Sequence, residues 1–132
     1  MARLARIVLP GVPHHVTHRG NGRQVIFLDD QDRFYYLRAL GQYLGRAEAE
    51  LWGFCLMSNH VHLIVVPRDG EGLARGVGLA HRRFAQRQNS VHGWTGHLFE
   101  NRFFSTPLDG VHLWAAARYV ERNPVRGGMV GS

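Results

Sequence analysis

The hydrophobic residues of the chain recur with two periods, and each period predicts one kind of element. Residues 13–19 alternate in the manner of a half-buried strand, and two apolar runs joined by Ser58-Asn59 predict an antiparallel hairpin. The two faces of the first strand are expected to carry His14, Val16 and His18 on one side and His15, Thr17 and Arg19 on the other. The predicted strands are 13–19, 50–57, 60–66 and an aromatic-rich 97–107.

Apolar residues three and four positions apart predict helices, each with one buried stripe. The predicted helices are 30–46, begun by an aspartate cap at 29 or 30, then 73–89, and finally 110–122, ended by Asn123-Pro124. The stripes expected to face the core are Phe34, Leu37, Leu40 and Leu44 in the first helix and Leu73, Val77, Ala80 and Phe84 in the second. At 132 residues, the chain is expected to form one domain, 1–132.

The strand predicted over 60–66 carries two imidazoles, His60 and His62, with Val61 between them. Residues two apart in a strand project from the same face, so both rings address one spot. Two neutral imidazoles side by side could bind a divalent metal ion. A pair of hydrogen-bonded core or edge histidines is the commoner reason for an isolated His-x-His, and both interpretations remain open on this motif alone.

The last predicted helix places a phenol and an amide one turn apart, at Tyr119 and Asn123. They share a stripe with His112 and Ala116, and small residues there let the backbone approach a neighbouring element closely. A surface tyrosine beside an asparagine cap would give the same pattern. This helix alone therefore does not define a site.

The net charge of +6 and the isoelectric point of about 10.7 indicate an anionic partner. All sixteen cationic residues are arginine, which offers phosphate a bidentate fork, although a GC-rich genome would produce the same bias. Two placements suit nucleic acid: the turn Gly20–Arg23, whose N–H groups could cradle a phosphate, and the arginines of helix 73–89. A plain turn and a solvated helix face are the alternatives.

A single cysteine, Cys55, excludes an intramolecular disulfide and fits a reducing compartment. No apolar run is long enough to span a bilayer, and the amino-terminal residues lack the apolar region of a secretory signal. A cytoplasmic protein that contacts no membrane is therefore expected, and it would be nucleoid-associated if its anionic partner is DNA.

Four blocks, in order and at suitable separations, resemble the REP-associated tyrosine transposases, which are single-tyrosine members of the IS200-like HUH transposases. HUH stands for His-hydrophobic-His, matched here by His60-Val61-His62. The blocks are P-G-V-P-H-H-V-T-H-R-G-N-G-R-Q at 10–24, L-M-S-N-H-V-H-L-I at 56–64, L-F-E-N-R-F at 98–103 and R-Y-V-E-R-N-P-V-R at 118–126. Many members of that family continue with a segment containing a Trp-Ser-Ser motif, where this sequence reads G-G-M-V-G-S.

The resemblance implies an α+β fold, a ferredoxin-like antiparallel sheet with helices packed on it. It also implies metal-dependent nicking and rejoining of single-stranded DNA at hairpin-forming repeats, through a 5′-phosphotyrosine intermediate. By the same resemblance, Tyr119 is the nucleophile, and His60, His62 and Asn123 bind Mg²⁺ or Mn²⁺. The partner would be single-stranded DNA with a REP-type hairpin, bound by a monomer or homodimer. The arginines expected to contact DNA are Arg19, Arg23, Arg82, Arg83, Arg87, Arg102, Arg118, Arg122 and Arg126.

Two other classes of function compete with this one. A DNA-binding module could keep the fold and recognise hairpins without cutting them, although the complete set of four expected site residues argues against it. A structural metal protein is disfavoured because a closed site needs four protein ligands, and the sequence offers no obvious fourth.

Overall fold

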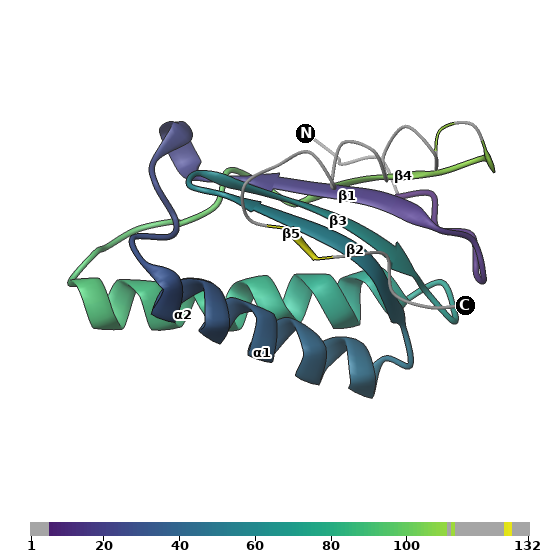
Figure 1. Cartoon of the computed structure of the whole chain (residues 1–132), viewed down its shortest axis with the longest axis horizontal. Helices are drawn as coiled ribbons and strands as arrows, with labels where there is room; N and C mark the ends of the chain where they lie inside the picture. The colour runs from purple at the N-terminus through teal and green to yellow at the C-terminus, as the bar shows by residue number, and fades with distance from the viewer. Residues whose placement is uncertain (1–5, 111, 113–125, 128–132) are drawn as a thin grey trace.

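The computed structural model describes residues 6–110, 112, 126 and 127, which form a sheet with two helices on one face (Figure 1). The strands of this antiparallel sheet lie in the order β4-β1-β3-β2-β5. They are β1 (His14–Arg19), β2 (Glu50–Met57), β3 (His60–Val66), β4 (Phe104–Pro107) and β5 (Arg126–Gly127). The helices are α1 (Asp30–Arg46) and α2 (Leu79–His92), with a 3-10 turn η1 (Asn21–Arg23) and a π turn η2 (Ala74–Gly78).

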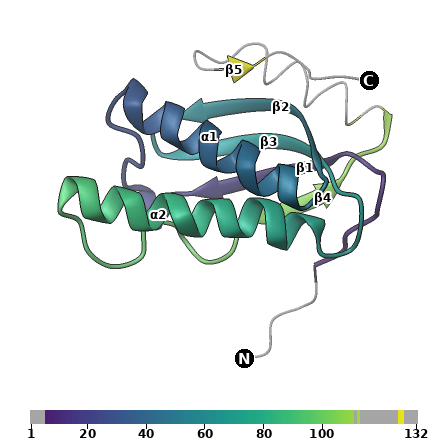
Figure 2. The same cartoon turned by 90° about the horizontal axis from the view of Figure 1, so that it is seen from below.

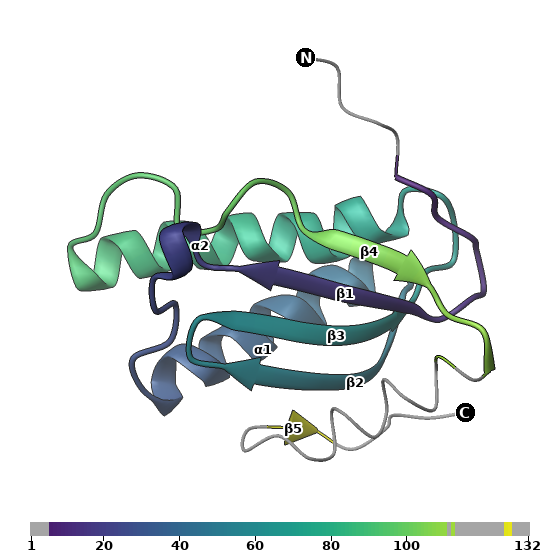
Figure 3. The same cartoon turned by 90° about the horizontal axis from the view of Figure 1, so that it is seen from above.

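The order of elements along the chain, β1-α1-β2-β3-α2-β4, together with the spatial order β4-β1-β3-β2, is that of the ferredoxin-like fold. The predicted fold class is confirmed. Seen from below, α1 and α2 lie side by side across one face of the sheet (Figure 2). Seen from above, the same two helices lie behind the sheet, which leaves its other face toward the viewer (Figure 3).

The predicted alternation in β1 is confirmed, and it decides which face of the sheet joins the core. Val16 is fully buried against the helices, and His14 and His18 point the same way. In β3 the core positions are Val61, Leu63 and Val65, each with no exposed surface. His60 and His62 therefore project from the opposite face, as the spacing predicts.

The buried stripe predicted for α1 is wrong at one position. Tyr36, Leu40 and Leu44 face the core, whereas the Phe34 side chain is 64% exposed. Two residues along a helix correspond to a rotation of about 200°, so Phe34 cannot share the face of Tyr36. Tyr36, which the predicted stripe did not include, joins the core because its ring packs against Phe84 of α2.

The stripe predicted for the second helix is confirmed, since Leu73, Val77, Ala80 and Phe84 are all fully buried. The helical segment begins at 72, one residue before the predicted start, and its first turns include the π turn η2. Its end differs from the prediction: α2 continues past Asn89 to His92, where Gly93 caps it at φ 70°. A left-handed cap of this kind favours glycine because it has no Cβ.

The strand predicted over 97–107 is mostly wrong, because only Phe104–Pro107 forms a strand, β4, and Phe99 contributes no more than an isolated antiparallel bridge to Gly20. The preceding residues bond to the end of β1 in an irregular path: the N–H of Asn21 donates to Leu98 O and that of Glu100 donates to Arg19 O. Asn101 has φ 48°, which interrupts an extended strand. This path lets Phe99 and Phe103 both bury their rings, which alternation in a strand 97–107 would also have allowed. The burial of these two rings therefore does not distinguish the predicted strand from the observed irregular path, whereas the backbone hydrogen bonds do.

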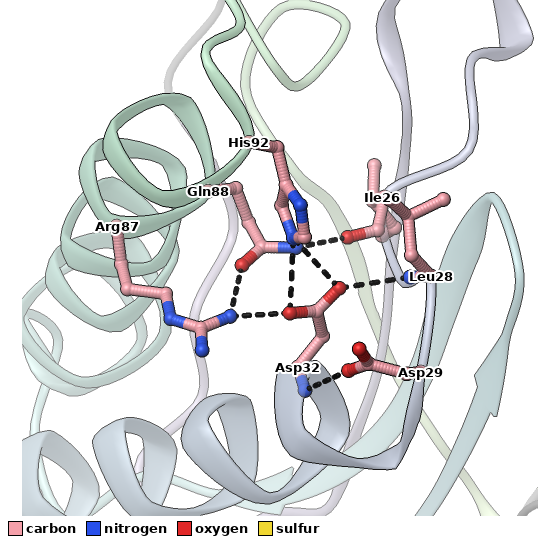
Figure 4. Close-up of polar contacts among 7 residues, drawn as sticks. All are labelled: Ile26, Leu28, Asp29, Asp32, Arg87, Gln88 and His92. Atoms are coloured by element: carbon pink, nitrogen blue, oxygen red, sulfur yellow. Dashed lines mark hydrogen bonds and ion pairs between the residues drawn. The ribbon is translucent and has the colours of Figure 1, made fainter.

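A buried carboxylate, Asp32, joins the start of α1 to the end of α2 (Figure 4). Its side chain is 1% exposed and forms an ion pair with Arg87 and a second contact, at 3.1 Å, with His92 Nε2. The N–H of Leu28 donates to Asp32 Oδ2, and the N–H of Asp32 donates to Asp29 Oδ1 as the helix cap. Because these partners come from α2 and from the loop before α1, Asp32 ties the two helices and that loop together.

Burial and hydrogen bonding shift the pKa of Asp32 in opposite directions. Burial raises it, but donors from the Leu28 backbone and from Gln88, Arg87 and His92 more than compensate, and the pKa falls to about 2. The charged form is therefore favoured in the folded state. A carboxyl with a depressed folded-state pKa stabilises the fold above its unfolded pKa of about 4, and this stabilisation is lost as the pH falls toward 2.

We expect Asp32→Asn to lower the free energy of unfolding by about 2–4 kcal/mol at pH 7, because it leaves the Arg87 charge without its buried partner. Urea unfolding between pH 7 and pH 2 measures this loss. Wild-type protein should lose about 2 kcal/mol on acidification through this group, and the variant should not. Asp30→Asn is the control, since the Asp30 side chain is 80% exposed in its contact with Arg33. Equal effects of the two substitutions would contradict the assignment.

Candidate functional site

The face of the sheet opposite α1 and α2, called the open face below because these two helices leave it uncovered, centres on the two imidazoles of β3. Their ring centroids lie 4.9 Å apart with the planes at 83°, so the two rings meet edge to face. The antiparallel register of β1 sets Arg19 opposite His60 and Thr17 opposite His62. Because these partners share a face with the imidazoles, the site has a cation and a hydroxyl as its immediate neighbours.

A hydrogen bond from His60 to Asn59 fixes the protonation of the His60 ring. His60 Nδ1 lies 2.7 Å from Asn59 Oδ1, and Asn59 Nδ2 donates to Arg23 O, which orients the amide with its oxygen toward the ring. An amide oxygen only accepts, so Nδ1 of His60 carries the proton. In the neutral ring, Nε2 then bears the lone pair that metal coordination requires.

A third imidazole, His15, lies beside His62. His15 Nε2 is 3.0 Å from His62 Nδ1, and the rings stack with centroids 5.2 Å apart. If His62 donates in this bond, its Nε2 is the unprotonated nitrogen, as in His60. His15 was not among the predicted site residues. The alternation placed it on the correct face, but only the pairing of β1 with β3 brings it to His62.

The site disfavours protonation of all three rings. Burial lowers the pKa of His15, and burial followed by the charge of Arg19 lowers that of His60. The pKa of His62 falls to about 4, through burial first and then through the neighbouring charges of His15, His60 and Arg19. A small apolar cluster centred on Cys55 and Ile64 lies on the same face, where Cys55 pairs with His62.

Four of the predicted site residues lie outside the described part of the chain: Tyr119, Asn123, Arg118 and Arg122. The backbone of Arg126 is described, and it pairs with Cys55 at the edge of the sheet. Cys55 in turn pairs with His62. Arg126, Cys55 and His62 therefore lie side by side on three neighbouring strands. Arg126 follows the Tyr119–Asn123 segment in the sequence, three residues after Asn123.

The arginines predicted to contact DNA have different surroundings. Arg19 and Arg23 lie at the end of β1 and in η1, and Arg82 and Arg83 are both exposed on α2. Arg102 lies in the segment before β4. Arg87 is bound to Asp32, so its guanidinium already has a structural role.

Of the two alternatives for Gly20–Arg23, a plain turn and a phosphate cradle, the backbone hydrogen bonds favour the plain turn. The N–H groups of Asn21, Arg23 and Gln24 donate to carbonyls of Leu98, Gly20 and Asn21. These three donors are therefore used within the protein and are not offered to an anion. Within η1, positive φ falls on Gly22 and Arg23 rather than on Asn21. The turn instead supports the site, because Arg23 O holds the Asn59 amide.

Among the described residues, no group of three or more histidine, cysteine, aspartate or glutamate side chains is arranged to hold a metal ion. A metal ion held by the two imidazoles of β3 would therefore need a further ligand beyond those that these described side chains supply. Nor does any described helix combine the length and apolar character needed to cross a membrane.

A comparison with protein families identifies the family of this chain. The family model for IS200-like transposases matches residues 11–123, and the chain belongs to that family. No curated protein matches the chain.

Two solved structures share the fold. One is a REP-associated tyrosine transposase bound to a REP hairpin, with a TM-score of 0.63 and 15% identity over 87% of this chain and 67% of that one. The other is a candidate transposase from Deinococcus radiodurans, with a TM-score of 0.62 and 16% identity over 91% of this chain and 96% of that one. The predicted family membership is confirmed.

The Asn59 contact predicts a measurable tautomer. In imidazole ¹H–¹⁵N correlation spectra at a pH where the rings are neutral, His60 should be protonated at Nδ1 and not at Nε2. Asn59→Ala should remove this preference and give a mixture of tautomers, whereas Asn89→Ala, which only breaks a bond to Gly96 O, should not. A wild-type His60 protonated at Nε2 would contradict the assignment.

Proposed function

We propose that this chain nicks and rejoins single-stranded DNA at hairpin-forming repeats, with Tyr119 as the nucleophile. The observation that carries the proposal is the pair of imidazoles on the open face, held by Asn59 and His15 in an arrangement suited to a metal ion. Membership of the IS200-like transposases supports it. The proposal that the DNA partner forms a hairpin is based on the similar structure that was solved with a bound REP hairpin.

His60 and His62 would hold a divalent ion through their Nε2 atoms, and Asn123 would add an amide oxygen. The donors fit such an ion, because the hydrogen bond to Asn59 leaves His60 with its coordinating nitrogen unprotonated. Two nitrogen donors favour Mn²⁺ over Mg²⁺, which prefers oxygen ligands. When bound, the ion neutralises charge on the scissile phosphate and polarises it toward attack.

The reaction proposed for Tyr119 conserves the energy of the phosphodiester. The phenol loses its proton and its oxygen bonds to phosphorus. The bond from phosphorus to the 3′ oxygen breaks, and that oxygen takes up a proton to become a free 3′-hydroxyl. The other end stays on the protein as a 5′-phosphotyrosine. Attack by another 3′-hydroxyl reverses these steps and releases Tyr119, so rejoining needs no ATP.

The pairing of β5 supports the role given to the segment before it. Asn123 is three residues from Arg126, and three residues of extended chain span at most about 11 Å. Arg126 pairs with Cys55 and Cys55 with His62, so only two strand spacings, about 10 Å, separate Arg126 from the His62 backbone. Covalent geometry therefore allows Asn123 to reach the imidazoles.

A protein that binds hairpins without cutting them is the second candidate function. The basic charge and the exposed arginines would serve it equally well. The imidazole pair favours the enzyme, because hairpin binding alone gives no reason for two neutral histidines on an open face.

The covalent intermediate gives the first test. Incubated with Mn²⁺ and a labelled single-stranded hairpin oligonucleotide, the protein should form an adduct that survives denaturation. Tyr119→Phe should abolish the adduct and leave hairpin affinity unchanged, because only the nucleophilic oxygen is removed. Tyr43→Phe, on α1 and away from the open face, should behave as wild type. Adduct from Tyr119→Phe at the wild-type yield would refute the nucleophile, and binding without adduct in every protein would favour the second candidate function.

Metal binding gives a test that does not depend on cleavage. We expect His60→Ala and His62→Ala each to weaken Mn²⁺ binding by at least about tenfold, measured by titration calorimetry without DNA, because each removes one of few ligands. His97→Ala is the matched control, since His97 is exposed and lies in the segment between α2 and β4. Unchanged Mn²⁺ affinity in both β3 variants would remove the metal from the mechanism.

A further inference from the structure

The side chains next to the two imidazoles on the neighbouring strands determine the charge around the candidate site. β1 and β2 flank β3 in the sheet, one on each side (Figure 3). The cross-strand partners are Arg19 and Met57 for His60, and Thr17 and Cys55 for His62. Direct partners share a face of the sheet, so these four side chains project with the imidazoles. Arg19 is the one charged side chain among the four, and no carboxylate is among them.

Arg19 has a fixed backbone and an exposed side chain. Its carbonyl accepts a hydrogen bond from the N–H of Glu100, at 2.9 Å, and its Cα pairs with that of His60. None of the ion pairs between described residues includes Arg19. Glu100 lines the same hollow as Arg19, of about 200 Å³, yet no ion pair joins the two. The guanidinium is therefore held near the site without a direct carboxylate partner.

The charge of Arg19 acts on both imidazoles. Burial lowers the pKa of His60 most, and the charge of Arg19 lowers it further. The pKa of His62 is lowered by burial first, then by the charges of His15 and His60, and then by that of Arg19. A positive charge that disfavours a proton on these rings also disfavours a metal cation bound to them. Arg19 would therefore repel the ion that the imidazoles are proposed to hold.

The proposed ligands do not remove this repulsion. His60, His62 and Asn123 are neutral donors, so they compensate none of the charge of a divalent ion. A DNA phosphodiester brings the missing negative charge, spread over two non-bridging oxygens. One oxygen can face the ion while the other accepts hydrogen bonds from a guanidinium, whose planar fork suits phosphate. The charge distribution of this site thus favours an ion and a phosphate together over an ion alone.

We propose that Arg19 is a catalytic residue that binds one non-bridging oxygen of the scissile phosphate, and that this contact makes metal binding and DNA binding reinforce each other. The inference rests on the proposed function, because it assigns a role to Arg19 in that same reaction. Without DNA, Arg19 weakens metal binding. With DNA bound, its guanidinium stabilises the charge that gathers on the phosphate oxygens as the Tyr119 oxygen attacks phosphorus.

Metal affinity without DNA gives a test that is independent of cleavage. Mn²⁺ alone is titrated into the protein, and electron paramagnetic resonance measures the free ion. Arg19→Gln should bind Mn²⁺ about fivefold more tightly than wild type, which is the scale of a solvent-screened interaction between neighbouring charges. Arg19→Lys keeps the charge and should stay within about twofold of wild type. The matched control is Arg38→Gln, because Arg38 is exposed on α1, on the other side of the sheet, and its substitution should change nothing.

The same titration with DNA present measures the coupling between the ion and the strand. The probe is a hairpin oligonucleotide with an unpaired extension, and every protein also carries Tyr119→Phe so that no cleavage occurs. The oligonucleotide should raise the Mn²⁺ affinity of the protein that retains Arg19, after subtraction of the Mn²⁺ bound by DNA alone. This gain should be about fivefold smaller with Arg19→Gln, because there is no longer a repulsion for the phosphate to relieve.

The rate of adduct formation separates a catalytic role from a simple contribution to DNA affinity. With Tyr119 intact and with Mn²⁺ and the oligonucleotide both saturating, Arg19→Gln should slow the adduct about a hundredfold, as expected for the loss of one preorganised donor to the reacting phosphate. Arg19→Lys should recover part of the rate, because it restores the charge but not the fork. The affinity for the hairpin without metal should fall less than about threefold in Arg19→Gln.

Two results would overturn the role of Arg19. One is Arg19→Gln with the Mn²⁺ affinity and the saturated rate of wild type. The other is a loss of hairpin affinity with an unchanged saturated rate, which would make Arg19 an ordinary DNA contact. Failure of the proposed function looks different: no adduct in any protein, with tighter Mn²⁺ binding and reduced coupling in Arg19→Gln, refutes cleavage by Tyr119 and supports the link that Arg19 makes between ion and DNA.

Discussion

The antiparallel register between β1 and β3 is the constraint on which the rest of the site depends. It sets Arg19 beside His60 and brings His15 to His62. Because side chains alternate along a strand, a slip of one residue would move the imidazoles into the core and Val61 and Leu63 into solvent. The free-energy cost of exposing those apolar residues fixes the register. Hydrophobic burial on one face of the sheet therefore positions the imidazoles on the other face.

The two faces of the sheet accordingly carry different kinds of polar group. On the helix side, Asp32 and its partners and the hydrogen-bonded chain His18–His81–Tyr36 are buried and fully used within the protein. On the open face, His60 uses Nδ1 in its hydrogen bond to Asn59, and Arg19 is exposed at the end of its strand. Polar groups already satisfied stabilise a fold, whereas donors and acceptors kept at a surface can bind a substrate.

Arginine content alone does not identify the surface that meets DNA. Arg82, Arg83 and Arg87 lie within six residues on one helix, yet one lines a cavity, one faces solvent and one holds a buried carboxylate. The positive charge of the chain thus divides between a structural ion pair and a charged surface. Only the surface part can contribute to phosphate affinity.

The sequence by itself determined the strands β1, β2 and β3, the hairpin between the last two, the inward stripe of the second helix, and the shared face of His60 and His62. These depend on local periodicity, which short-range geometry imposes. Tertiary structure decided the rest. It exposed Phe34, replaced most of the strand 97–107 by an irregular path, tied Arg87 to Asp32, and placed His15 at His62. Each of these follows from pairing or packing between segments far apart in the chain, and no local pattern encodes which distant partner a residue meets.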